Sequence, residues 1–272
     1  MSGSFFIFIS MKNNRIGIFD SGVGGTSIWK EINALMPYEQ TIYLADSKNA
    51  PYGHKSREDI IRLSIKNTEK LISLDAKIIV VACNTATTNA IDYLRKNYSI
   101  PFIGIEPAIK PAALKTKTKQ VGILATKGTL KSDLFSKTSE LYAQNINVIE
   151  VIGEGLVPLI ENGKLYSPEM TTLLSKYLNP MLEAQIDYLV LGCSHYPYLI
   201  PQLKKMLPED VTIIDSGRAV AKQTKAILKS NKLETLIRHK TASLFYTNAK
   251  TETLKDLLKK HQKNISITYL DF

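Results

Sequence analysis

Short apolar runs of the β type alternate with amphipathic helical stretches along most of this chain. Up to Glu106, the β-type runs are RIGIFD, QTIYLAD, AKIIVVACN and IPFIGIE, and the stretches between them include TSIWKEINALM, REDIIRLSIKNTEKLISL and TATTNAIDYLRKNY. Strands that alternate with helices are typical of βαβ units, whose strands lie parallel in one sheet. The alternation therefore predicts an α/β protein built on parallel sheets with helices on both faces.

The pattern restarts after Glu106-Pro107. Further strands are predicted at KQVGILATKGT, INVIEVIG, YLVLGCS and VTIIDSG, with helices over 132–144 and 171–185. Basic helices and a strand at TASLFYT complete the chain.

The two halves carry matching landmarks, which indicate a duplication. Cys83 follows Asp20, at the end of the first strand, by 63 residues, and Cys193 follows Thr126 by 67 residues. We therefore expect two similar α/β lobes with an active-site cleft between them. The expected boundaries place residues 1–105 and 215–272 in the first, discontinuous lobe and residues 106–214 in the second.

Cys83 and Cys193 are the only cysteines in the 272 residues, and each stands at the end of an apolar run. In open α/β sheets, residues that handle ligands lie just beyond the carboxyl ends of strands, so two facing lobes would bring both cysteine loops into one cleft. A disulfide is the weaker interpretation in a reducing cytoplasm, and a zinc site lacks the Cys-x-x-Cys spacing. A lone cysteine is usually a small buried hydrophobe, but the matched placement of two favours chemistry.

The residues that follow each cysteine suggest how its thiol is activated. Cys83 precedes NTATTNAIDYLRK, a predicted helix whose first amides would lower the thiol pKa and favour a thiolate. Cys193 precedes Ser194 and His195, and a histidine can orient or deprotonate a thiol.

FDSGVGG, Phe19 to Gly25, lacks both the G-x-G-x-x-G order and the Walker lysine, so it does not indicate a nucleotide site. It places Asp20 and Ser21 on a glycine-permitted turn with free amides, which suits a ligand that carries an ammonium and a carboxylate group. The alternative is that Asp20 only caps a helix.

Three other features carry weaker signals. The loop APYGHKS could grip a carboxylate through its backbone amides or be a plain turn. His54 in this loop has no evident partner and is expected at the surface. Glu154 and Glu161, in IGEGLVPLIENG, are candidate acids, although such glutamates are most often only solvated.

The net charge is +10, and most of the excess lies near the C-terminus. Between Lys204 and Lys263 there are 14 Lys or Arg against 6 Asp or Glu, a surplus of 8. A basic surface can bind nucleic acid. However, these lysines fall between apolar residues at helical spacing, which favours solvated helix faces.

The length allows a substantial core, and 44% apolar with 22% charged residues is ordinary for a soluble protein. No apolar run reaches the roughly 18 residues of a membrane-spanning helix. FFIFI, Phe5 to Ile9, lacks the basic residue and cleavage site of a secretory signal. We expect a cytoplasmic protein in which residues 1–10 are either a short extension or a misplaced start before Met11.

Seven motifs in this order and spacing resemble the glutamate racemases. They are IGIFDSGVGG, PYG, VVACNTAT, IEPA, ATKGT, VPLIE and LGCSHYP, and the resemblance runs from about Ile16 to Gly217. It implies a cofactor-independent enzyme with two α/β lobes that interconverts L- and D-glutamate and supplies the D-isomer for peptidoglycan. No cofactor and no metal are expected.

The resemblance also implies roles for single residues. Cys83 would be the base that acts on D-glutamate, and Cys193 the base that acts on L-glutamate. Asp20 would support Cys83, whereas His195 and Glu161 would support Cys193. The positions that match the substrate-binding residues of the family are Asp20, Ser21, Pro51, Tyr52, Gly53, Asn84, Thr85, Thr126, Thr129, Ser194 and His195.

This chemistry agrees with the residue types. Racemisation removes a proton from one face of Cα and delivers another to the opposite face, so two acid/base groups must flank the substrate. Without a pyridoxal ring, the carbanion must be stabilised by fixed donors aimed at the α-carboxylate. Closure of two lobes would exclude water from that site.

The chain departs from the family pattern at three places. Ser194 stands where threonine is usual, which keeps the hydroxyl but loses a methyl group. The loop ADSKNA lacks the arginine that is common there. GEGL stands where a third cysteine is common, so Glu161 rather than Glu154 is taken as the acidic residue.

Other identities and partners stay open at this point. An aspartate racemase of the same superfamily is the first alternative, and a basic, non-catalytic nucleic-acid-binding module is the second. The HYP after Cys193 favours glutamate, and nucleic acid is not an expected partner, although some glutamate racemases inhibit gyrase. The resemblance further implies a homodimer of unspecified arrangement and, in some members, activation by a muramyl-peptide nucleotide.

Overall fold

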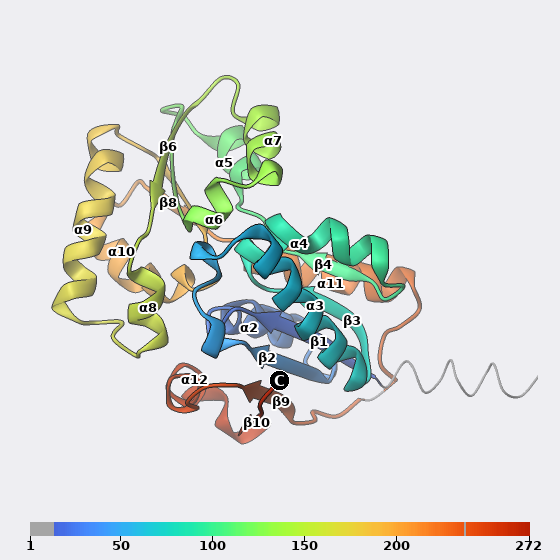
Figure 1. Ribbon diagram of the computed structural model, residues 1–272. Helices are drawn as coiled ribbons and strands as arrows, with labels where there is room; N and C mark the ends of the chain where they lie inside the picture. Colours follow the sequence, from blue (N-terminus) through green and yellow to red (C-terminus); the bar gives the residue numbers. More distant parts are fainter. Residues whose placement is uncertain (1–13, 237) are drawn as a thin grey trace, which may run out of the picture.

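In a computed structural model, the structure describes residues 14–236 and 238–272. The FFIFI run and the question of residues 1–10 and Met11 lie outside these residues. The described chain forms two lobes, each built on its own parallel sheet (Figure 1). The prediction of two α/β lobes is thus confirmed, whereas the boundaries at 105/106 and 214/215 stay a prediction.

The first lobe contains a six-stranded sheet in the order β10-β9-β2-β1-β3-β4, with every pairing parallel. Its strands are β1 (Arg15–Asp20), β2 (Thr41–Ala45), β3 (Ala76–Val81), β4 (Phe102–Gly104), β9 (Ser243–Thr247) and β10 (Ile265–Tyr269). Its helices are α2 (Thr26–Leu35), α3 (Arg57–Ser73), α4 (Asn84–Asn97), α11 (Gly217–Ser230) and α12 (Glu252–Leu258), with short 3₁₀ turns η1 (Ser47–Asn49), η2 (Tyr52–His54) and η4 (Lys259–Asn264).

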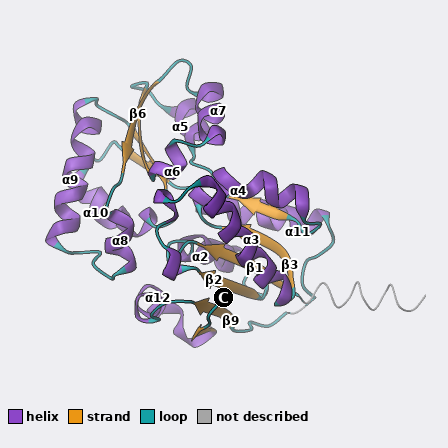
Figure 2. Cartoon of the chain, viewed as in Figure 1, coloured by secondary structure: helices purple, strands orange, loops and turns teal. Residues whose placement is uncertain are grey.

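Both faces of this sheet are covered by helices, which explains why its strands are apolar throughout rather than alternating (Figure 2). In β3, Ile78 and Val80 pack in the same core as α2 and α11, whereas Ile79 and Val81 pack with α3 and α4. Successive side chains of a strand point to opposite faces. The run IIVV therefore fills two cores at once.

The second lobe contains a four-stranded parallel sheet in the order β6-β5-β7-β8. Its strands are β5 (Gln120–Ala125), β6 (Asn147–Ile152), β7 (Tyr188–Gly192) and β8 (Thr212–Ile214). Its helices are α5 (Ile109–Lys115), α6 (Lys127–Leu130), α7 (Asp133–Tyr142), α8 (Leu156–Glu161), α9 (Pro168–Glu183) and α10 (Ile200–Met206), with the 3₁₀ turn η3 (Tyr196–Leu199).

Capping residues explain where the helices of the second lobe begin. The Ser132 side chain accepts the amide of Phe135 at the start of α7, close to the predicted start at 132. Helix α9 begins three residues before the predicted 171, because Ser167 accepts the amide of Met170 and Pro168 occupies its first turn.

The C-terminal region differs from the expectation in two ways. Strand β10 was not predicted, and it extends the first sheet beyond β9. The stretch TETLKDLLKKHQKN is helical only to Leu258 and continues as the 3₁₀ turn η4.

The lysines of α11 lie on one exposed face, as predicted for a solvated helix. Lys222, Lys225 and Lys229 are exposed, whereas Val220, Thr224 and Leu228 are buried. Across the residues that the structure describes, none of the helices is both long enough and apolar enough to cross a membrane.

Candidate active site

The carboxyl ends of the two sheets contribute to one cavity between the lobes. Asp20 ends β1, and Cys83 follows the neighbouring strand β3. In the second lobe, Thr126 follows β5 and Cys193 follows the neighbouring strand β7. The catalytic cavity is lined by Ser21, Pro51, Tyr52, Gly53, Cys83, Asn84, Thr85, Thr126, Val157, Cys193, Ser194 and His195. The expectation that both cysteine loops meet in one cleft is confirmed, and both thiols are free.

Cys83 lies at the N-terminus of α4 and is only 4% exposed. Its Sγ accepts the amide of Ala86 at 3.4 Å, and its thiol donates to Ser21 Oγ at 3.6 Å. Burial and the nearby Asp20 carboxylate nevertheless raise the pKa of Cys83, and outweigh the Ala86 amide and the Ser21 hydroxyl, which lower it. The prediction of a lowered pKa at Cys83 is therefore wrong, because the sequence shows the helix but neither the burial nor the carboxylate.

Asp20 is fully buried and joins the two lobes. Its Oδ2 accepts the amides of Gly22 at 3.2 Å and Gly25 at 3.0 Å, and its Oδ1 accepts the Ser194 hydroxyl at 3.1 Å. Burial raises the pKa of Asp20, although His195 and the Gly25 amide act in the opposite direction. The Asp20 carboxylate thus binds the amides of its own turn, as a helix cap would, and also binds Ser194 of the second lobe.

The glycines of FDSGVGG allow the second lobe to come close. A Cβ atom on Gly22 would lie 2.0 Å from a carboxylate oxygen of Glu161, and one on Gly24 would lie 2.2 Å from His195 Nδ1. Any side chain at either position would push these two residues away from the first lobe. The loop was interpreted from sequence as a turn that suits a ligand with an ammonium and a carboxylate group, and close approach between the lobes is a second reason for its glycines.

Cys193 is buried beside a histidine and a glutamate. Its Sγ lies 3.8 Å from His195 Nδ1, and His195 Nε2 lies 2.5 Å from Glu161 Oε1. Burial lowers the pKa of His195, but the Cys193 sulfur, the Glu161 carboxylate and Asp20 outweigh it, so the pKa of His195 is raised well above its usual value. This environment favours an imidazolium between the thiol and the carboxylate.

Glu161 also binds the first lobe directly. Its Oε1 accepts the amide of Val23 at 2.7 Å and its Oε2 accepts the Ser47 hydroxyl at 2.9 Å. Glu154, the alternative acid in the sequence, lies instead at the surface, where it pairs with His54 at 3.1 Å. His54 is exposed, as expected, but the structure gives it this partner in the opposite lobe.

Asn84 is the clearest sign of a ligand in the cavity. It is 2% exposed, and neither polar atom of its side chain finds a hydrogen-bond partner within the described chain. Buried amides are almost always paired, and Asn84 lines the catalytic cavity. An unpaired donor and acceptor in that place suit a ligand that has both kinds of group, such as an amino acid.

Three threonines lie at the contact between α4 and α6. Thr85 Oγ1 lies 2.8 Å from Thr126 Oγ1 and 3.4 Å from Thr129 Oγ1. Thr126 and Thr129 are also bonded to each other at 3.0 Å. These hydroxyls connect the first lobe to the second. Thr129, however, does not itself line the catalytic cavity.

The PYG loop is held by residues that the sequence analysis missed. The Tyr52 hydroxyl donates to Asp46 at 2.5 Å and accepts a hydrogen bond from the side-chain amide of Asn67 at 3.1 Å. Asn248, which follows β9, donates to the same Asp46 carboxylate at 2.5 Å. Asp46 follows β2 as Asp20 ends β1, so its place at a strand end was a usable signal. Nothing in the sequence connected Asn248 with this loop.

The lobes are closed around the site. The catalytic cavity has a free volume of about 10 Å³, roughly what one water molecule needs. A glutamate molecule is far larger, so the lobes must separate before a substrate of that size enters. Among the described residues, no group of three or more His, Cys, Asp or Glu side chains could hold a metal ion.

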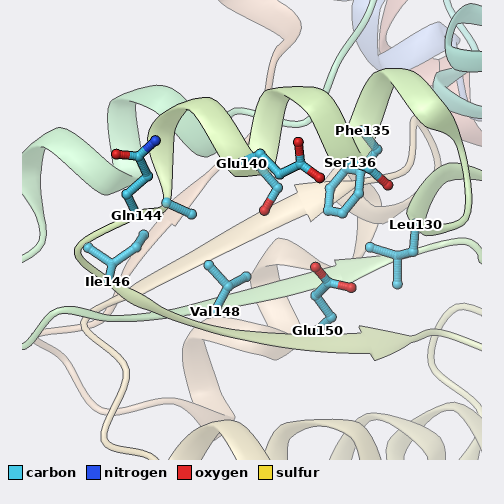
Figure 3. Close-up of a pocket in the computed structure, with 10 residues that line it drawn as sticks. Leu130, Phe135, Ser136, Glu140, Gln144, Ile146, Val148 and Glu150 are labelled. Atoms are coloured by element: carbon cyan, nitrogen blue, oxygen red, sulfur yellow. The ribbon is translucent and has the colours of Figure 1, made fainter.

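Another cavity, of about 650 Å³, lies in the second lobe away from the thiols. Figure 3 shows it between α7 and β6, where Phe135 and Glu140 from the helix face Val148 and Glu150 from the strand. Burial raises the pKa of Glu150. This α7–β6 groove shares no lining residue with the catalytic cavity.

Comparisons with known proteins show which family this chain belongs to. Residues 16–224 match the Asp/Glu/Hydantoin racemase family. The chain is 45% identical to a glutamate racemase of Herpetosiphon aurantiacus over 218 residues, which cover 80% of this chain and 86% of that one.

Solved structures of glutamate racemases show the same fold. That of Bacillus anthracis has a TM-score of 0.85 at 32% identity, and the match covers 96% of this chain and 98% of the other. That of Escherichia coli, in complex with L-glutamate and the activator UDP-MurNAc-Ala, has a TM-score of 0.81 at 33% identity, covering 94% and 98%. The chain therefore belongs to the Asp/Glu/Hydantoin racemase family and, within it, to the glutamate racemases.

Proposed function

We propose that this protein interconverts L- and D-glutamate with two cysteine bases and without a cofactor. One observation carries the proposal: two free thiols, each at the carboxyl end of a strand in a different sheet, line a single buried cavity. The similarity to glutamate racemases supports glutamate as the substrate.

The reaction needs acid/base groups on both faces of Cα, and the two lobes supply one each. When L-glutamate is bound, Cys193 removes the Cα proton and Cys83 delivers a proton to the opposite face, which yields D-glutamate. The reverse reaction exchanges the roles. Each turnover leaves the proton on the other sulfur, so the thiols must exchange protons with solvent before the same direction repeats.

The two sulfurs have different electrostatic surroundings. The raised pKa of Cys83 keeps that thiol protonated as an acid. The imidazolium of His195, itself held by Glu161, lies beside Cys193 and places a positive charge next to that sulfur. This difference supports the assignment of Cys83 as the acid and Cys193 as the base in the conversion of L-glutamate.

The carbanion that forms at Cα requires donors fixed on the α-carboxylate. Asn84 and Thr85 stand in the first turn of α4 and line the cavity, and the first amides of a helix have no partner within it, so this turn can supply such donors. Ser21 and Ser194 add hydroxyls from opposite lobes, and Asp20 can accept the substrate ammonium. Closure of the lobes removes water, which strengthens these donors and protects the intermediate.

The remaining assignments rest on the resemblance to glutamate racemases. We infer that the product supplies D-glutamate for peptidoglycan synthesis and that the enzyme works as a homodimer. The Escherichia coli relative was crystallised with UDP-MurNAc-Ala, and we propose that a muramyl-peptide nucleotide of this kind also activates this protein.

A racemisation assay tests the proposed function. The purified protein should convert either pure enantiomer of glutamate to an equal mixture without added cofactor, followed by polarimetry or chiral chromatography. Aspartate should react at least about a hundredfold more slowly, since its side-chain carboxylate is one methylene nearer to Cα and is misplaced in the closed site. A preference for aspartate would refute glutamate as the substrate.

A further inference from the structure

A large cavity adjoins the catalytic cavity at the junction of the lobes, and we call it the vestibule. Its volume is about 710 Å³. It lies where α8 of the second lobe faces the segment that leads into α12 of the first (Figure 1). The vestibule is lined by Val23, Ser47, Ala50, Pro51, Val157, Pro158, Glu161, Asn162, Ala249, Lys250, Glu252 and Thr253.

The vestibule narrows from an exposed rim to a buried base. Asn162, Lys250 and Glu252 at its rim are exposed, whereas Val23 and Val157 at its base are buried. Two lining residues, Pro51 and Val157, also line the catalytic cavity. The base of the vestibule is therefore a wall of the catalytic cavity.

Glu161 stands in this wall and holds it closed. Its Oε2 accepts a hydrogen bond from the Ser47 hydroxyl of the first lobe. Its Oε1 accepts one from the Val23 amide and lies 2.5 Å from His195 Nε2. The Ser47–Glu161 bond thus crosses from one lobe to the other at the boundary of the two cavities. Opening the wall requires that this bond break and that Pro51 move away from Val157.

The outer wall of the vestibule is a strap formed by residues 248–253, which run from the end of β9 into the first turn of α12. Asn248 is bonded to Asp46 of the first lobe, and the Thr253 hydroxyl donates to the carbonyl of Glu161 in the second lobe at 2.8 Å. The strap therefore touches both lobes. It also lies beyond residues 16–224, the part of the chain that matches the family.

We propose that the vestibule is the route by which a dicarboxylic amino acid enters and leaves the catalytic cavity, with strap residues 248–253 as its outer wall. This inference rests on the proposed function. The α7–β6 groove offers a contrast, because it is nearly as large yet has no residue in common with the catalytic cavity (Figure 3). The vestibule is therefore distinguished by its shared wall with the catalytic cavity and not by its size.

The test fills each cavity with a phenyl group and compares the rates. Ala249→Phe occupies the vestibule, and Ala143→Phe, at an equally half-buried alanine, occupies the α7–β6 groove as the matched control. Ala249→Phe should lower kcat/KM for both enantiomers roughly tenfold, since entry is slowed. Ala143→Phe should stay within about twofold of the parent.

A binding measurement separates slow entry from a damaged site. In the Cys83→Ser/Cys193→Ser background, calorimetry with D-glutamate should give the same Kd with and without Ala249→Phe, because the closed site is not touched. Glu252→Phe, at an exposed rim residue, gives a second obstruction if Ala249→Phe unfolds. Parental kcat/KM in both folded vestibule variants, or a raised Kd that accounts for the whole loss, would overturn the proposal. Absence of racemisation by the parent would instead refute the proposed function.

Discussion

The two cysteine loops have the same position in their lobes but opposite electrostatic surroundings. Cys83 caps a helix of 14 residues, yet a buried carboxylate lies near it and its pKa is raised. Cys193 is followed by only a short 3₁₀ turn, yet a histidine of raised pKa lies beside it. Equivalent backbone positions have therefore been given unlike neighbours. The backbone of each lobe thus places a sulfur, whereas side chains of the same lobe set its electrostatic surroundings: Asp20 lies near Cys83, and His195 lies beside Cys193.

The carboxylates of Asp20 and Glu161 accept different numbers of hydrogen bonds from the opposite lobe. Asp20 of the first lobe accepts Ser194 from the second, and Glu161 of the second lobe accepts Val23 and Ser47 from the first. Both carboxylates need the closed state to be fully bonded. Closure of the lobes therefore also completes the surroundings of both thiols.

The largest expected effect is the loss of either sulfur. Cys83→Ser and Cys193→Ser should each reduce racemisation by roughly 10⁴-fold, because a serine hydroxyl is too weak an acid and base to replace a thiol. The comparison of the loops predicts similar losses, since each turnover uses both groups. Chiral chromatography of long incubations measures the residual rates, and a variant with near-parental turnover would show that its sulfur is not required.

A smaller effect is expected when the neighbours are changed and the sulfurs are kept. His195→Gln should lower kcat roughly a hundredfold, and its pH–rate profile should lose the dependence on an imidazolium. Asp20→Asn should cause a loss of similar size through substrate binding, seen mainly in KM. The two variants should therefore differ in which constant changes, and identical kcat and KM shifts would contradict the assigned division of roles.

Asp20→Asn should also stabilise the fold. Burial raises the pKa of Asp20, so the folded state binds a proton that the unfolded state releases, and stability is lost as pH rises through 3.8 toward the folded pKa. The neutral amide removes this penalty, and we expect about 1 kcal/mol more stability at pH 7. Urea unfolding at pH 7 and near pH 3.5 measures it. An advantage that did not shrink at the lower pH would point to packing instead of charge.

The smallest effect is expected at Ser194. Its hydroxyl donates to Asp20, and Ser194→Thr keeps that donor while it adds one methyl group. Turnover should change within about threefold, less than the tenfold that 1.4 kcal/mol would cause. Ser194→Ala is the matched control, because it removes the hydroxyl without adding bulk and should cost more. Equal losses in both variants would mean that the hydroxyl is not used.

Much of the fold could be predicted because the spacing of apolar residues and the ends of strands are local properties of the sequence. The apolar runs located β1, β3, β5 and β7, and the rule that ligands bind at carboxyl ends joined the two cysteine loops. Strand β10 was missed although ISITY alternates apolar and polar residues, because the run is short and follows a lysine-rich stretch. Its pairing with β9 is a tertiary choice that sequence spacing does not reveal.

The residues of the site could be predicted from the sequence, but the shifts of their pKa values could not. The positions of Cys83, Cys193 and His195 follow from motifs, yet the raised pKa of Cys83 depends on burial and on Asp20, which only the folded lobes bring together. The support of the PYG loop by Asn248 joins residues about 200 positions apart. No local pattern encodes such a contact.

The central claim is that the two sulfurs serve opposite faces of one glutamate molecule, and deuterium exchange tests it most directly. In deuterated water, each single variant should still exchange the Cα proton of the one enantiomer that its remaining sulfur can reach. Cys83→Ser should therefore label L-glutamate and not D-glutamate, whereas Cys193→Ser should label D-glutamate only. Labelling of the same enantiomer by both variants, or of both enantiomers by either one, would contradict the account.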